Sequence, residues 1–323
     1  MKYPLYFQDN LFDNVLIFDG LTRTGRGLVA PLVSDLPGVD YVQLDNAVDH
    51  IPVLWQLGLL DDQSAASFLR MTVDGCAYAR AIGRHLNTRY DDQYSIYQSL
   101  NTKNILKRAF GEEGQPAIDR FNGEGLFSSF IVHFQLQMAK LWFMAFPNLR
   151  IVLTVRHPVD VCTSWQSRKW GSRFGKDPLS FWPIPEIDGN PVPWFAVDFA
   201  QEYIKLNPMS RIVKSVIALN NINKDTLLDL SPVQQKQVKT ACFEKFATEP
   251  VHQIKEFAKW LNTSIQPEMD TAMAKLRTPR KLDIKDRKTK LGLIKENVEP
   301  YLFEQLIIES RNYETEWGLE PVR

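Results

Sequence analysis

The sequence has little of several features that mark large classes of protein. Its 323 residues include three widely spaced cysteines, an odd number, so neither a disulfide framework nor a metal-ligand spacing is visible. The 38 basic and 38 acidic residues cancel, which argues against a general nucleic-acid binder, because affinity for a duplex comes mainly from neutralising phosphates. The few cysteines, and first residues without an apolar run of signal-peptide length, favour a reducing compartment. We expect a cytoplasmic protein.

Long apolar runs free of polar side chains are also missing. The closest approach lies between residues 126 and 146, and it is interrupted by His133, Gln135, Gln137 and Lys140. Such side chains are costly in lipid, so this segment predicts a long buried core helix that ends at Pro147, and no membrane span.

Strand, turn and helix patterns alternate along the chain. An apolar β-type run at 15–18 leads into a glycine-rich turn at 19–27 and helical spacing at 28–33. A continuous apolar run at 149–155 is typical of a strand buried on both faces of a parallel sheet. We therefore predict an α/β fold, a central mostly parallel sheet flanked by helices, in a single domain over residues 1–323. Further expected elements are a short strand at 41–44, mostly helix at 62–110 with caps at Asp62 and Thr102, helices up to about residue 230, a strand at 238–246 and a helix at about 249–261.

Residues 165–199 differ in composition from the rest, because they hold five prolines and eight tryptophan or phenylalanine side chains. So many prolines forbid a long helix or a central strand. We predict an ordered insertion that acts as a lid or as part of an acceptor pocket. Our hypothesis is that Trp170, Trp182 and Trp194 line that pocket, and the alternative is that each belongs to the core.

A first candidate phosphate-binding segment is Gly20-Leu-Thr-Arg-Thr-Gly-Arg-Gly27, between an expected strand and an expected helix. Its glycines allow a tight turn that brings backbone N–H groups close to an anion, and the helix N-terminus adds further donors. Arg23 and Arg26 supply charge. The segment has no Gly-Lys-Ser/Thr and is therefore not a Walker A loop. The alternative is an ordinary turn whose glycines are structural.

A second candidate segment begins where the strand at 149–155 ends. Arg156 stands at the strand end, Pro158 suits the first position of a helix, and Ser164 follows about a turn and a half into that helix. An arginine at the carboxyl edge of a sheet and a serine on the next helix can converge on one phosphate.

These two segments resemble those of sulfotransferases that use 3′-phosphoadenosine 5′-phosphosulfate (PAPS). That family pairs a 5′-phosphosulfate loop, often Pro-Lys-Ser-Gly-Thr-Thr or Arg-Ser-Gly-Thr, with Arg-(Asn/Asp)-Pro-x-Asp-x-x-x-Ser, whose Arg and Ser hold the 3′-phosphate. Arg23–Gly27 is similar to the loop, and Arg156–Asp160 with Ser164 matches the second pattern. His157 stands where the family has Asn or Asp, and we interpret it as a turn residue rather than a catalyst.

Two later segments are also similar to that family. Residues 241–250 resemble its Tyr-Glu-Asp-Leu strand, with Phe243 at the Tyr position near the adenine; the alternative for Phe243 is a core aromatic. The stretch from Arg287 resembles the C-terminal Arg-Lys-Gly-x-x-Gly-x-Trp-Lys, whose Arg and Lys clamp the 3′-phosphate. Thr289 and Ile294 depart from that pattern, and the alternative is a solvated basic stretch.

The resemblance implies a P-loop-like fold and a function. It implies transfer of a sulfuryl group from PAPS to a hydroxyl or amine by metal-independent in-line displacement. Because no Golgi-type anchor is visible, we expect a small-molecule acceptor first and a glycan second. By resemblance, Arg23 occupies the position of the family's catalytic Lys. The implied donor-binding residues are Arg23, Thr24, Gly25, Arg26, Gly27, Leu28, Arg156, Ser164, Phe243, Arg287 and Lys288.

The general base is the least defined part of this prediction. No Lys-Thr-His stands where cytosolic members of the family carry their His. Glu124, before the expected long helix, is the first candidate, and His133 is the second. The alternative for His133 is a helix residue with a satisfied imidazole, and His50, Asp45 and His85 also stay open.

Two other functions stay open. An ATP-dependent P-loop phosphotransferase would need a loop lysine and Mg²⁺ ligands. A non-catalytic sensor or scaffold would bind adenosine 3′,5′-bisphosphate without turning it over.

Overall fold

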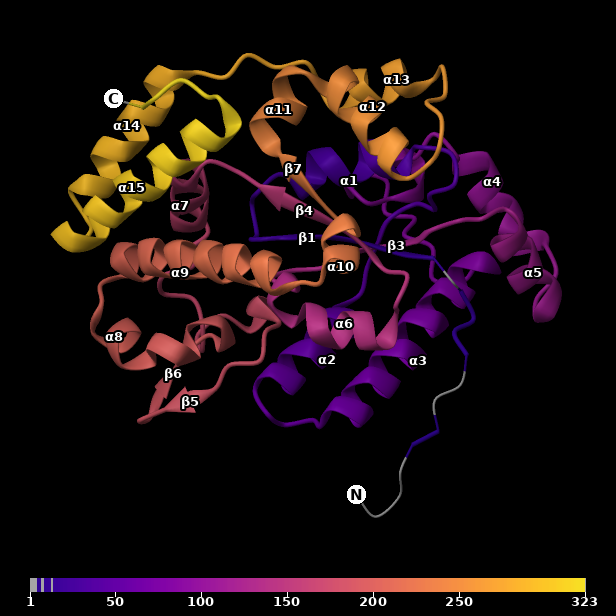
Figure 1. The fold of residues 1–323 in the computed structure, drawn as a ribbon, viewed down its shortest axis with the longest axis horizontal. Coiled ribbons are helices and arrows are strands. Elements are labelled where there is room, and N and C mark those ends of the chain that lie inside the picture. The colour runs from indigo at the N-terminus through magenta and orange to yellow at the C-terminus, as the bar shows by residue number, and fades with distance from the viewer. Residues whose placement is uncertain (1–4, 7–8, 13, 323) are drawn as a thin grey trace. The chain divides into compact units, whose positions relative to one another are not determined.

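The computed structural model describes residues 5–6, 9–12 and 14–322 (Figure 1). These residues fall into two compact units. The sheet unit comprises the described residues up to 20 together with 25–154 and 231–280, and the helical unit comprises 21–24, 155–230 and 281–322. The single domain expected over residues 1–323 stays a prediction. Among the described residues, no helix combines the length and the apolar character that a membrane crossing requires.

A five-stranded sheet forms the centre of the sheet unit, in the order β2-β3-β1-β4-β7. Strand β1 runs parallel to both of its neighbours, with Val15 opposite Ser128 and Leu16 opposite Arg150, and β2 runs parallel to β3. Every residue of β1 is buried, as expected of a strand covered on both faces. The predicted α/β fold with a mostly parallel sheet is confirmed. The strands are β1 (Val15–Gly20), β2 (Gln43–Leu44), β3 (Ser128–Ile131), β4 (Arg150–Val155) and β7 (Val238–Cys242).

Helices cover both faces of this sheet. Figure 1 shows α1 and α11 to α13 on one face, and α2, α3 and α6 on the other. The apolar side of α1 packs with β1, α11, α12 and α13 into one continuous core. The helices include α1 (Arg26–Ser34), α2 (Asn46–Gln56), α3 (Asp62–Ala81), α4 (Thr102–Lys107), α5 (Gln115–Gly123), α6 (Ala139–Ala145), α10 (Pro232–Lys236), α11 (Phe243–Thr248), α12 (Pro250–Trp260) and α13 (Met269–Lys275).

The helical unit is built on α7, which contacts α9, α14 and α15. The proline-rich stretch 165–199 forms short 3₁₀ turns and a two-stranded hairpin, as its prolines require. Trp170 and Trp194 are buried in an aromatic cluster with Trp165 and Phe195, so for these two the core alternative holds. The elements include α7 (Pro158–Ser167), β5 (Glu186–Ile187), β6 (Asn190–Pro191), α8 (Ala200–Lys205), α9 (Pro208–Asp229), α14 (Ile284–Lys295) and α15 (Pro300–Trp317).

The long helix expected at 126–146 is wrong. Its first part is strand β3, and helix resumes only with a 3₁₀ turn at Leu136–Met138 and the short α6. A short apolar run fits a buried strand as well as a buried helix, and pairing with β1 and β2 decided between them. The buried carboxylate of Asp19 accepts the N–H groups of Gln135 and Leu136, at 2.9 and 2.7 Å, and so fixes the restart.

Two other expected elements are shorter than predicted. The helical region at 62–110 is broken after Ala81, and its caps are Asp61 and Asn101, one residue before those predicted. The strand at 238–246 stops at Cys242, and Phe243 begins α11.

Candidate functional site

The turn between β1 and α1 offers backbone donors. Gly25, the N-cap residue of α1, has a left-handed φ of 104°, and the hydroxyl of Thr24 donates to the carbonyl of Leu21 at 2.6 Å. The first N–H groups of a helix have no acceptor inside it, so such a turn can bind an anion. The N–H of Leu28 donates to the Gly25 carbonyl at 2.8 Å and its side chain is buried, so Leu28 helps to close the turn.

Two side chains of the sheet unit pack closely against Gly25 and Gly27 at the start of α1. A Cβ on Gly25 would clash with Cδ2 of Phe243 and lie 3.1 Å from its Cγ. The amide of Gln93 donates to the Gly27 carbonyl and fills the space that a Cβ there would need. Phe243 is half-buried and packs on the core, and stacking of a base on it stays a prediction.

Arg26 does not present its charge to a ligand in the way predicted. It is buried, and its Nη1 donates to the carbonyls of Gly20 and Val132 at 2.6 and 2.7 Å. Burial lowers the pKa of this guanidinium. Arg26 therefore ties the end of β1 to the segment after β3, and its place among the phosphate ligands is corrected.

Within the helical unit, Arg23 and Ser164 lie in contact. The Nε of Arg23 donates to the Ser164 hydroxyl at 2.9 Å, and Nη1 of Arg156 donates to the Arg23 carbonyl at 3.2 Å. The indole of Trp165 donates to the Thr22 carbonyl at 2.9 Å. Arg23 thus contacts both Ser164 and Arg156. The expected convergence of Arg156 and Ser164 on one phosphate stays a prediction.

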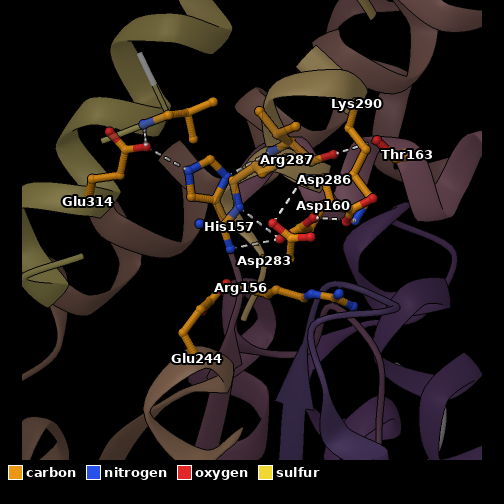
Figure 2. Close-up of polar contacts among 12 residues, drawn as sticks. Arg156, His157, Asp160, Thr163, Glu244, Asp283, Asp286, Arg287, Lys290 and Glu314 are labelled. Carbon is orange, nitrogen blue, oxygen red and sulfur yellow. Dashed lines mark hydrogen bonds and ion pairs between the residues drawn. The ribbon is translucent and has the colours of Figure 1, made fainter. Parts of the chain in front are cut away.

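His157, which we interpreted as a turn residue, stabilises the first turn of α7. Nδ1 of His157 accepts the N–H of Val159 at 3.3 Å and caps the helix. Its Nε2 lies 3.1 Å from a carboxylate oxygen of Glu314 on α15, and the imidazole is fully buried (Figure 2). His157 therefore has the structural role expected of a turn residue, and its exclusion as a catalyst stays a prediction.

A buried ion-pair cluster joins α7 to α14. Asp160 accepts from Nε and Nη2 of Arg287 at 3.1 and 2.9 Å, and from Lys290 at 2.9 Å (Figure 2). Burial alone would raise the pKa of Asp160, but Arg287, Lys290 and Arg156 outweigh burial and hold this pKa below its usual value.

The two residues expected to form the C-terminal clamp, Arg287 and Lys288, lie in different environments. Arg287 is buried against a carboxylate, whereas Lys288 lies exposed on α14. The sequence prediction missed Lys290 as a partner of Asp160. Its spacing of three from Arg287 on a helix is the signal that places both on one face.

Glu124 and His133 lie at opposite ends of β3. Glu124 caps α5 and precedes β3, while the glycine-rich segment follows β1. Because β1 and β3 are parallel and in register from Val15 and Ser128, Glu124 lies at the amino edge of the sheet and Gly20 at the carboxyl edge. A six-residue strand spans about 20 Å. The structure therefore does not bring Glu124 to the glycine-rich segment, and the first choice of base is corrected.

His133 follows β3 at the carboxyl edge. Both neighbours of His133 are bound to the end of β1. Arg26 donates to the carbonyl of Val132, and the N–H of Phe134 donates to the carbonyl of Gly20 at 3.3 Å. Its ring Nδ1 lies 2.7 Å from Oδ2 of Asp49, and 19% of its side chain is exposed. Burial, and then the charge of Arg26, lower the pKa of His133. Of the other open candidates, Asp45 caps α2 and His85 is exposed.

Neither family models nor curated proteins match the chain. Among solved structures, sulfotransferase STF9 from Mycobacterium avium is 10% identical, with a TM-score of 0.46 over 97% of this chain and 78% of that one. The sulfotransferase domain of the Synechococcus PCC 7002 olefin synthase is 12% identical, with a TM-score of 0.44 over 97% and 98%. A sulfotransferase from Alicyclobacillus acidocaldarius is 14% identical, with a TM-score of 0.41 over 95% and 96%.

Proposed function

We propose that the chain is a sulfotransferase that uses PAPS as donor and a hydroxyl or amine of a small molecule as acceptor, with a glycan as the second acceptor class. The observation that carries the proposal is the contact of Arg23 with Ser164 and Arg156. This contact pairs a glycine-rich strand-to-helix turn with a second strand-to-helix junction in the order that the resemblance to sulfotransferases requires.

The proposal assigns each phosphate of the donor to its own group of residues. The N-terminus of α1, with Gly25 in a left-handed conformation, suits the 5′-phosphosulfate. Arg156 and Ser164 suit the 3′-phosphate, since an arginine binds two oxygens of one group and a serine hydroxyl adds a donor. Arg23 would face the bridging oxygen, where its permanent charge stabilises the leaving phosphate.

The reaction needs one proton acceptor in addition to these charges. PAPS supplies a sulfur that forms a bond to the acceptor oxygen or nitrogen while its bond to the 5′-phosphate oxygen breaks, and the bond electrons leave with that phosphate. The acceptor loses a proton in this step. His133 is our choice for taking it, because its imidazole at the carboxyl edge is held by Asp49 and a neutral ring nitrogen can act as the base.

Calorimetry and turnover test the proposal in two steps. Adenosine 3′,5′-bisphosphate should bind with a dissociation constant well below millimolar. Absence of binding at millimolar concentration would contradict the proposal. Labelled PAPS should then be turned over with members of an acceptor panel. Binding without turnover would favour a sensor, and Mg²⁺-dependent hydrolysis of ATP without nucleotide-bisphosphate binding would favour a phosphotransferase.

The base can be tested with a matched pair of variants. His133→Gln should lower turnover by about a hundredfold and leave bisphosphate affinity unchanged, because a general base supplies about that factor. Glu124→Gln, at the other end of β3, should leave both unchanged. A fall in turnover with Glu124→Gln alone would contradict this choice of base.

A further inference from the structure

We infer that Asp49 is a positioning residue that fixes the tautomer and raises the basicity of His133. The inference rests on the proposed function for its catalytic meaning, because His133 is the proton acceptor there. The contact between Asp49 and His133 joins residues 84 apart in sequence, and neither their types nor their spacing predicts it.

Both carboxylate oxygens of Asp49 are used on the same residue. Oδ1 accepts the backbone N–H of His133 at 2.8 Å, and Oδ2 lies 2.7 Å from its ring Nδ1. A carboxylate only accepts, so Nδ1 carries the hydrogen and Nε2 carries the basic lone pair. Because one rigid group holds both main chain and ring, the imidazole is fixed relative to its own backbone.

A second set of contacts holds the carboxylate and the imidazole together. The amide nitrogen of Gln135 donates to the carbonyls of Asp49 and His133, at 3.2 and 3.0 Å. The amide oxygen of Gln135 accepts the indole N–H of Trp142 at 2.9 Å, and both side chains are fully buried. Gln135 thus joins the main chain of Asp49 to that of His133, which keeps the carboxylate and the imidazole in register.

Three charged groups act on the imidazole from three elements. Asp49 from α2 and Asp19 from β1 favour the protonated ring, whereas burial and Arg26 from α1 favour the neutral ring. The neutral ring is the form that can accept a proton. Asp49 then stabilises the imidazolium that forms when the acceptor proton arrives, as a carboxylate partner does for a catalytic histidine.

The test observes His133 directly by nitrogen NMR of the full-length protein labelled in histidine, with His133→Gln to assign its signals. In the unaltered protein His133 should be the Nδ1–H tautomer at neutral pH. In Asp49→Asn the share of the Nε2–H tautomer should rise and the His133 pKa should fall by about one unit, because a stabilising charge is lost. Glu314→Gln is the matched control, since it alters the partner of His157 and should leave the His133 signals in place.

Each outcome decides the inference. An Nε2–H tautomer in the unaltered protein overturns it, even if Asp49→Asn does not fold. An unchanged His133 pKa in a folded Asp49→Asn protein also overturns it, as does an equal change in Glu314→Gln.

Kinetics separates this inference from the proposed function. Asp49→Asn should lower kcat about tenfold or more with KM for PAPS unchanged, and it should move the acidic limb of the pH profile to lower pH. If NMR gives the expected result but no acceptor is sulfated, the proposed function is contradicted and the positioning of His133 by Asp49 still holds. Turnover that survives Asp49→Asn unchanged would contradict that role.

Discussion

The chain turns from strand to helix after β1 and again after β4, and the two turns are built differently. After β1, a left-handed glycine begins α1, and backbone N–H groups supply the donors. After β4, Pro158 begins α7, His157 caps it, and the side chains of Arg156 and Ser164 supply the polar groups. The first turn depends on backbone shape and the second on side-chain identity, so substitutions should affect them in different ways.

The largest effect should come from Gly25→Ala. The new Cβ meets Phe243, and a φ of 104° is strained for any other residue, so the free energy of unfolding should fall by about 1–3 kcal/mol. Bisphosphate affinity should fall with it, because the backbone donors shift. Urea denaturation and calorimetry measure the two effects. Adding Phe243→Ala should remove the clash and keep the strain; complete recovery would show that the left-handed conformation is not required.

Arg156→Ala should weaken bisphosphate binding about 10- to 100-fold with little loss of stability, since a charge-assisted hydrogen bond contributes about 1.5–3 kcal/mol. Arg156→Lys should recover only part of the affinity, because a lysine cannot bind two oxygens of one phosphate in the same plane. Arg168→Ala, at an exposed position just after α7, is the matched control. Equal weakening by the control would mean that general charge, and not the position of Arg156, governs binding.

His157→Asn should separate capping from buried pairing. Asparagine also caps helices well, so α7 should keep its start. The buried contact with Glu314 is lost, and the free energy of unfolding should fall by about 1–3 kcal/mol. Denaturation measures the loss, and calorimetry should show unchanged bisphosphate affinity. A large fall in affinity would indicate that the contact between His157 and Glu314 sets the geometry of Arg156.

The smallest effect should be a pH dependence at Asp160. Its pKa is held below its usual value in the folded chain, so its contribution to stability is present above the unfolded pKa and is lost as pH falls through the folded pKa. The stability difference between the unaltered protein and Asp160→Asn should be constant near neutral pH and shrink below about pH 4. Asp286→Asn, whose exposed carboxylate pairs with Lys290, should change stability by less than about 1 kcal/mol. A difference that grows on acidification would contradict the direction of the pKa shift.

Local rules predicted the elements better than their lengths. The prolines of 165–199 and the proline at the start of α7 act on their own backbone, and both predictions hold. The segment 126–146 failed because its apolar residues fit a helix or a strand, and only the partners β1 and β2 could choose. The same error placed His133 inside a helix, whereas it follows β3 at the carboxyl edge of the sheet.

The sequence by itself determined the two strand-to-helix turns and the residue types at their ends, because glycine and proline constrain the backbone where they stand. The tertiary structure decided which charges are turned inward. Arg26 bonds to carbonyls, Arg287 pairs with Asp160 across 127 positions, and His133 pairs with Asp49 across 84. These contacts depend on strand register and helix packing, which join distant segments and leave no local pattern.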